Sequence, residues 1–164
     1  MKNNKWYVIS TFVLGCIVIN FAGRILSDRL QLPLWLDSFG TVTAAYVLGP
    51  FCGAMVGMTV NLTYGILYSW TNMFYAVVSA MVGITTGICV KKGFLKNLYG
   101  VLSTSFLIAV LSVTLSVPLN YLYCDGSTQN IWETVLLSLW KKLGLTAFSV
   151  TVWDSFILIF LIRL

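Results

Sequence analysis

Few residues in this chain could carry acid–base or metal chemistry. The 164 residues include no histidine and only five aspartates and glutamates. Serine–histidine hydrolysis and most zinc or haem sites need a histidine as base or ligand. The four cysteines lie far apart without a CxxC pair, so we interpret them as small core residues. We therefore expect no enzyme activity, no metal site and no cofactor.

A second group of residues suits ligand binding instead. Aromatic rings with a few amide and carboxylate groups offer a small planar ligand both stacking area and oriented hydrogen bonds. The aromatic belt of membrane proteins explains the same residues equally well. The candidate ligand contacts are Asn72, Tyr75, Asn120, Tyr123, Asp125, Trp153 and Asp154.

Two carboxylates are expected within or at the ends of apolar segments, where a charge is costly. Asp37 could cap a helix N-terminus, or with Trp35 it could form an outer lid over a ligand site. Asp154 lies roughly ten residues inside the last apolar segment, so it needs a donor such as Lys141, a wet cavity or a proton.

The elements that position these residues are expected to be membrane-spanning helices. Hydrophobic residues make up 59% of the chain and charged residues 9%, against about 25% charged in a typical soluble domain. Crossing a hydrocarbon core of about 30 Å takes roughly 20 helical residues. The chain is therefore predicted to be an all-α integral membrane protein, and nucleic-acid binding is not expected.

We predict one domain of six transmembrane helices. Residues 38–90 carry no charge, and the run is divided by Gly49-Pro50 and by the polar, aromatic stretch 68–72. Residues 131–143 alternate apolar and charged positions, as in a helix lying along the membrane boundary. The expected spans are about 6–26, 37–49, 51–69, 73–90, 97–123 and 144–162.

The basic residues favour an orientation with both termini in the cytoplasm. In that orientation the cytoplasmic cations are Lys2, Lys5, Lys91, Lys92, Lys96 and Arg163. Four others, Arg24, Arg29, Lys141 and Lys142, fall outside or at the interface.

Small residues recur at helical spacing in three stripes, and such stripes let helix backbones approach closely in lipid. We interpret the two inner stripes as packing within the bundle. The stripe on the first span could instead dock another membrane subunit. The stripes are Gly49, Gly53 and Gly57; Ser79, Gly83 and Gly87; and Thr11, Gly15 and Gly23.

Two segments carry a resemblance to a known family. The motif LPLWLDSFGT at 32–41 is followed by LGPFCGAMVG at 48–57 and by Asn61, and Asp125-Gly-Ser-Thr128 precedes a final span containing Asp154. Over nearly the whole chain this pattern resembles the substrate-binding S-components of energy-coupling-factor transporters. The similarity is to the riboflavin-type branch and to relatives without an assigned substrate.

The resemblance implies a six-helix protein of a prokaryotic plasma membrane that binds a vitamin-like micronutrient near its outer face. It also implies docking of the first helix onto a membrane coupling subunit that carries two ATP-binding subunits. The nearest equivalent of the family's Ala-xxx-Ala docking motif is Gly15 with Gly23, separated by the bulky Ile19. A membrane module that senses a ligand and signals to a partner stays open as an alternative.

Overall fold

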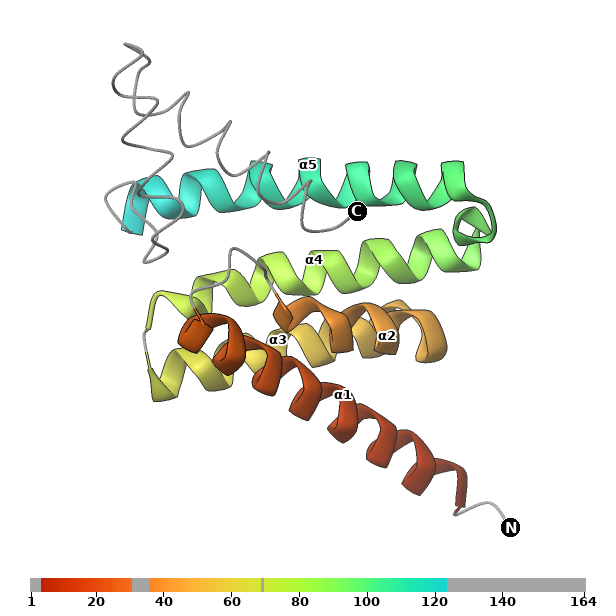
Figure 1. The fold of residues 1–164 in the computed structure, drawn as a ribbon, viewed down its shortest axis with the longest axis horizontal. Coiled ribbons are helices and arrows are strands. Elements are labelled where there is room, and N and C mark those ends of the chain that lie inside the picture. Colours follow the sequence, from red (N-terminus) through yellow and green to blue (C-terminus); the bar gives the residue numbers. More distant parts are fainter. Residues whose placement is uncertain (1–3, 31–35, 69, 124–164) are drawn as a thin grey trace.

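The computed structural model describes residues 4–30, 36–68 and 70–123, the side chains of residue 4 and of 120–123 aside, and these residues are all helical apart from short turns (Figure 1). The α-helices are α1 (Asn4–Leu30), α2 (Phe39–Leu48), α3 (Pro50–Leu67), α4 (Asn72–Lys91) and α5 (Leu98–Tyr123). Two short 3₁₀ turns, η1 (Leu36–Ser38) and η2 (Phe94–Lys96), precede α2 and α5. The predicted all-α class is confirmed over this part of the chain.

Four of these helices are long and apolar enough to cross a membrane, namely Lys5–Leu30, Pro50–Leu67, Asn72–Lys91 and Leu98–Leu119. The chain is therefore a membrane protein. Their ends lie within four residues of the corresponding predicted spans. The expected last span, 144–162, and the expected interfacial helix, 131–143, lie outside the described residues.

The expected short span at 37–49 differs from the structure. Only the ten residues of α2 are α-helical there, and they cover about 15 Å, half the thickness of a hydrocarbon core. In Figure 1, α2 accordingly runs alongside only the half of the bundle that is nearer the α2–α3 turn. The preceding turn η1 therefore begins part of the way along the bundle rather than at its end.

The sequence Gly49-Pro50 explains the sharp turn between α2 and α3. Gly49 has φ of 98°, a left-handed conformation that favours glycine, and its N–H donates to the Ala45 carbonyl at 3.1 Å. Pro50 follows as the first residue of α3, where a missing N–H breaks no intrahelical hydrogen bond. The break was therefore predicted at the correct position.

The two inner small-residue stripes pack helices together, as predicted, except that Gly49 lies in the turn before α3 and takes no part in this packing. A Cβ atom on Gly53 would lie 2.5 Å from the Ala45 Cβ, so α3 rests directly on α2. A Cβ on Gly57 would lie 2.9 Å from the Ser79 carbonyl oxygen of α4. A Cβ on Gly83 would lie 2.4 Å from the carbonyl carbon of Gly53. Helices α2, α3 and α4 thus form the tightly packed centre of the described structure.

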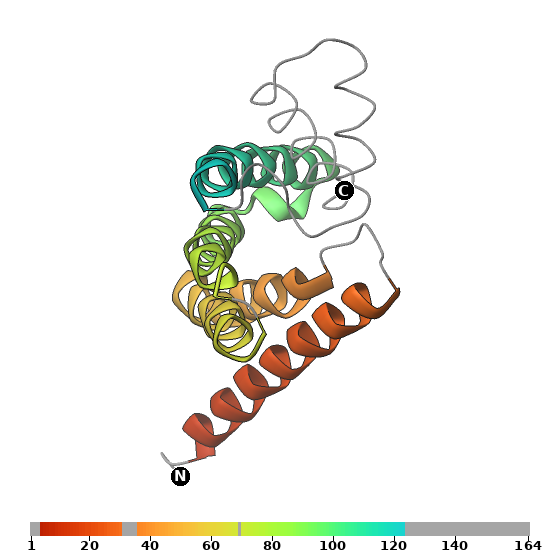
Figure 2. The ribbon, with the colours of Figure 1, turned by 90° about the vertical axis from the view of Figure 1, so that its left-hand side faces the viewer.

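Helix α1 lies at the periphery of this centre. Only 11% of the residues in its apolar window are buried, against 39–44% in α3, α4 and α5. Cys16 packs with Ala44 and Val56, whereas the N-terminal half of α1 diverges from the other helices (Figure 2). Its exposed apolar side chains, such as Trp6 and Leu14, are suited to lipid or to another membrane protein.

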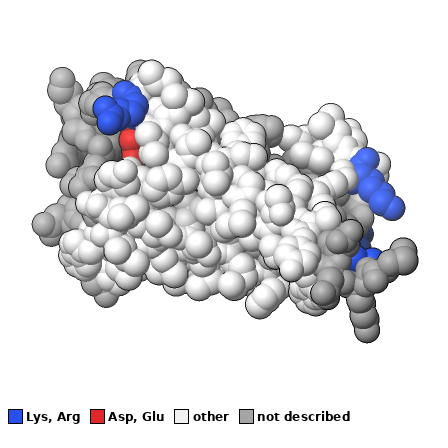
Figure 3. Space-filling model, turned by 90° about the horizontal axis from the view of Figure 1, so that it is seen from below, with Lys and Arg blue, Asp and Glu red and all other residues white. Residues whose placement is uncertain are grey.

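On the face shown in Figure 3, the described charged side chains gather at the two ends, separated by a broad band without charged residues. We call one the lysine end, which carries Lys5, Lys91, Lys92 and Lys96, and the other the acidic end, which carries the two described acidic residues, Asp28 and Asp37. Lys91 approaches Gly49, which places the α2–α3 turn at the lysine end.

Candidate functional site

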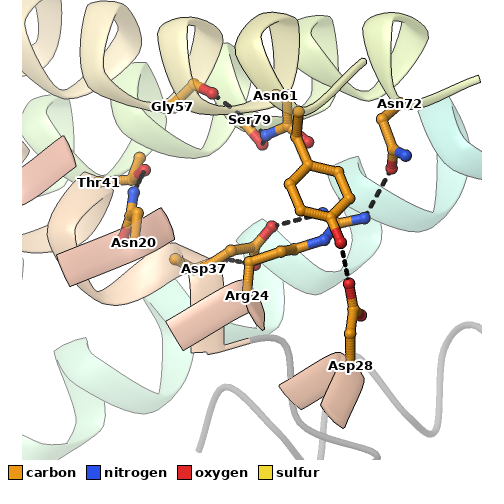
Figure 4. Close-up of polar contacts among 11 residues, drawn as sticks. Asn20, Arg24, Asp28, Asp37, Thr41, Gly57, Asn61, Asn72 and Ser79 are labelled. Atoms are coloured by element: carbon orange, nitrogen blue, oxygen red, sulfur yellow. Dashed lines mark hydrogen bonds and ion pairs between the residues drawn. The ribbon is translucent and has the colours of Figure 1, made fainter. Parts of the chain in front are cut away.

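A buried polar network joins three elements at the acidic end (Figure 4). Arg24, on the last part of α1, forms an ion pair with Asp37 of η1, with 2.9 Å between Nη1 and Oδ2. Its second terminal nitrogen donates to Oδ1 of Asn72, the first residue of α4, at 2.6 Å. One guanidinium therefore connects α1, the turn before α2 and the start of α4.

Burial makes this ion pair energetically important. The side chains of Arg24 and Asp37 are 14% and 6% exposed. A charge removed from water is strongly unfavourable unless it is paired and hydrogen-bonded. The fork of the guanidinium satisfies this requirement, since its two nitrogens donate to different acceptors.

Aromatic rings flank the network on α3. The Tyr64 ring lies under the Arg24 guanidinium, 4.7 Å from the ring centroid, and its hydroxyl donates a short hydrogen bond to Asp28. Tyr68 stacks on Tyr64 with 4.5 Å between centroids, and Phe21 meets the same ring edge-on at 5.9 Å. The site thus combines a cation, two carboxylates and several rings.

Replacing Tyr64 with phenylalanine is expected to lower the free energy of unfolding by about 1–2 kcal/mol, because the Asp28 carboxylate loses its hydroxyl donor. Tyr68→Phe is the matched control, since the Tyr68 hydroxyl makes no hydrogen bond with the described residues. Thermal unfolding in detergent measures both. Equal shifts in the two variants would contradict a stabilising role for the Asp28–Tyr64 bond.

Two buried asparagines fix the helices that carry the network. Asn20 is fully buried; its Nδ2 donates to the Thr41 hydroxyl at 2.9 Å, and its Oδ1 accepts from the Gly40 N–H at 2.5 Å. Asn61 donates to the Ser79 hydroxyl at 2.7 Å. The first contact ties α1 to the start of α2, and the second ties α3 to α4. Each contact therefore fixes two helices relative to each other.

Of the predicted site residues, the structure brings Asp37 and Asn72 into one network. The alternative role of Asp37 as a helix cap is not supported, because its carboxylate pairs with Arg24, while Ser38 occupies the cap position without a side-chain capping bond. Tyr75 is half-buried and lies one turn after Asn72 on α4.

The other predicted contacts lie in parts that the structure leaves undescribed. The backbones of Asn120 and Tyr123 belong to the last turns of α5, but their side chains are outside the described residues. Trp35, Asp125, Trp153 and Asp154 are outside them altogether. Their roles as lid and ligand contacts stay predictions.

No sequence pattern predicted Arg24, Asp28 and Tyr64 as residues of the site. Arg24 was expected outside or at the interface, in the role of a flanking cation. One available signal is that Arg24 and Asp28 are four residues apart, so they share one face of a helix. Their partners on η1, α3 and α4 are distant in sequence and become visible only in the fold.

The three residues predicted as a docking stripe do not share one free surface. Thr11 and Gly15 are exposed, and a Cβ on Gly15 would meet no other atom within 4 Å. Gly23 instead lies against the backbone of Leu36 in the same chain. A partner helix could therefore approach α1 closely at Thr11 and Gly15.

The charged and amide groups at the acidic end are paired with one another, and aromatic faces lie beside them. Within the described part of the chain, no group of three or more histidine, cysteine or acidic side chains could hold a metal ion.

No family model, curated protein or solved structure matches this chain. The resemblance to S-components of energy-coupling-factor transporters therefore stays a prediction from the sequence motifs.

Proposed function

We propose that this chain is the substrate-binding membrane subunit of an ATP-driven importer, and that it captures a vitamin-like micronutrient at the acidic end. The observation that carries the proposal is the Arg24–Asp37–Asn72 network. It joins a residue expected in the lid to a residue expected to contact the ligand, and these two expectations came from the sequence independently of Arg24.

The half-length of α2 supports the same location. Because α2 lies beside the half of the bundle nearer the lysine end, no α2 backbone occupies the corresponding position at the acidic end. Polar side chains from α1, η1 and α4 converge there instead. Membrane transporters commonly place ligand sites where a helix is interrupted and neighbouring helices supply polar groups.

The proposed orientation has the lysine end in the cytoplasm and the acidic end outside. The four described lysines all lie toward the lysine end, which agrees with the preference for cytoplasmic cations. A ligand bound at the acidic end would then be taken from outside the cell.

Cysteine labelling tests this orientation. In a background without the four native cysteines, we expect a membrane-impermeant maleimide to label Arg29→Cys in intact cells. Lys96→Cys should react only after permeabilisation. Both positions are exposed, so a difference in reactivity reports the side of the membrane. The reverse labelling pattern would contradict the orientation.

Capture of partners tests the transport proposal itself. We expect tagged protein from its native cells, purified in mild detergent, to retain one membrane subunit and two subunits that carry ATP-binding motifs. Gly15→Trp should reduce this capture, because it places a large ring on the face of α1 that is open in the isolated chain. Ile66→Trp, also at an exposed position but on α3, is the control.

The alternative function, a membrane module that senses a ligand and signals to a partner, predicts a different binding partner. Co-purification of a kinase without the ATP-binding transport subunits would favour this alternative over the importer. If Gly15→Trp and Ile66→Trp reduce the capture of the partner subunits equally, α1 is not the docking helix.

A further inference from the structure

We propose that Arg24 is the positioning residue of the acidic-end site: it holds Asp37 and Asn72 in their places, and ligand binding depends on that arrangement. The inference rests on the proposed function and adds a residue to it. Arg24 acts here through the two residues that it holds rather than through contact with the ligand.

The geometry carries this role because one side chain makes two directed contacts to separate elements. Nη1 lies 2.9 Å from Asp37 Oδ2, and Nη2 lies 2.6 Å from Asn72 Oδ1. Asp37 and Asn72 follow Arg24 by 13 and 48 residues in the chain. A planar guanidinium can donate in two fixed directions at once, whereas a lysine ammonium acts as a compact point charge.

The two elements that Arg24 contacts also pack against neighbouring helices: the Leu36 backbone lies against Gly23 of α1, and Met73 lies against Gly65 of α3. Turn η1 is three residues long, and Leu36 and Ser38 are only half-buried. Helix α4 begins at Asn72, one residue after a turn with exposed Trp70. Because Arg24 makes a directed polar contact to each of these elements, a change at Arg24 should loosen both segments, while the close packing of α3 on α4 is left in place.

Asp28 and Tyr64 keep the arginine itself in position. Asp28 lies one helical turn after Arg24 on α1 and accepts the Tyr64 hydroxyl hydrogen bond. The Tyr64 ring then supports the flat face of the guanidinium. With α1 so little buried, these polar contacts and the Asn20 contacts fasten its second half to the other helices.

Hydrogen–deuterium exchange on the full chain in lipid nanodiscs tests the proposal without knowledge of the ligand. We expect Arg24→Gln to raise amide exchange at least tenfold in two segments, 38–44 and 70–76, with little change in the packed segments 53–60 and 82–87. Arg24→Lys should retain protection at 38–44, because the ion pair persists, and lose it at 70–76. Arg29→Gln, exposed on the same helix, should match the wild type.

Small molecules retained by the same samples are measured by native mass spectrometry. A molecule carried by the wild type and by Arg29→Gln should be lost from Arg24→Gln and partly kept by Arg24→Lys. Loosening of only one segment, or of all helices equally, would overturn the positioning role. If Arg24→Gln does not fold, the exchange measurement is made on Asn72→Ala instead. Unchanged amide exchange at 70–76 in that variant would contradict the positioning role of Arg24. If the wild type carries no small molecule, the proposed function is wrong. The exchange rates of the segments 38–44 and 70–76 test separately whether Arg24 holds these segments in place.

Discussion

Gly83→Val is expected to destabilise the folded protein by about 3 kcal/mol, because it forces α4 away from α3. A Cβ at this position would lie 2.5 Å from the Ala54 nitrogen and 2.8 Å from the Gly53 carbonyl oxygen. These are backbone atoms within a helix, so they cannot turn aside as a flexible side chain would. Separating the helices would also break the close contact of Gly57 with Ser79.

Thermal unfolding in detergent, combined with size-exclusion chromatography, measures this effect. Gly15→Val is the matched control, because a Cβ on Gly15 would meet no other atom within 4 Å. We expect the control to unfold at the wild-type temperature and Gly83→Val to unfold far below it or to aggregate. Equal unfolding temperatures for the two variants would show that α3 and α4 do not pack through this stripe.

Asp37→Ala is expected to have an effect of similar size, about 3 kcal/mol, for an electrostatic reason. The substitution leaves the Arg24 guanidinium buried without its carboxylate partner. An uncompensated buried charge is more harmful than the loss of the pair as a whole. The double variant Arg24→Met/Asp37→Ala should therefore be more stable than Asp37→Ala alone.

The unfolding free energies of the single and double variants form a thermodynamic cycle that isolates the ion-pair coupling. Asp28→Ala serves as the comparison, because Asp28 is exposed and its removal should lower the free energy of unfolding by less than Asp37→Ala does. Additive effects of Arg24→Met and Asp37→Ala would mean that the two side chains do not interact in the folded protein.

The positions of the long helices could be predicted because lipid imposes simple rules on the sequence. A charge-free run of sufficient length must be helical to satisfy its backbone groups, and Gly49-Pro50 marks where the run divides. The packing role of Gly53 and Gly83 followed from their spacing along one helix face. These features depend on neighbouring residues, which the sequence shows directly.

The half-length of α2 and the role of Arg24 could not be predicted in this way. The segment 37–49 is compatible with a short span or with a turn followed by a shorter helix. The structure has the second arrangement, in which the Gly40 N–H at the start of α2 donates to the Asn20 side chain. Arg24 reaches partners up to 48 residues away. No local pattern distinguishes it from a cation that simply flanks a membrane span.

Native mass spectrometry of the protein, purified in mild detergent from cells grown in rich medium, tests whether this chain binds a vitamin-like molecule. We expect one small polar, aromatic molecule bound per chain in the wild type, with loss of this molecule in Asp37→Ala under conditions where the variant is still folded. A wild type that carries no such molecule, even after incubation with a panel of vitamins, would contradict the claim that this chain captures a micronutrient.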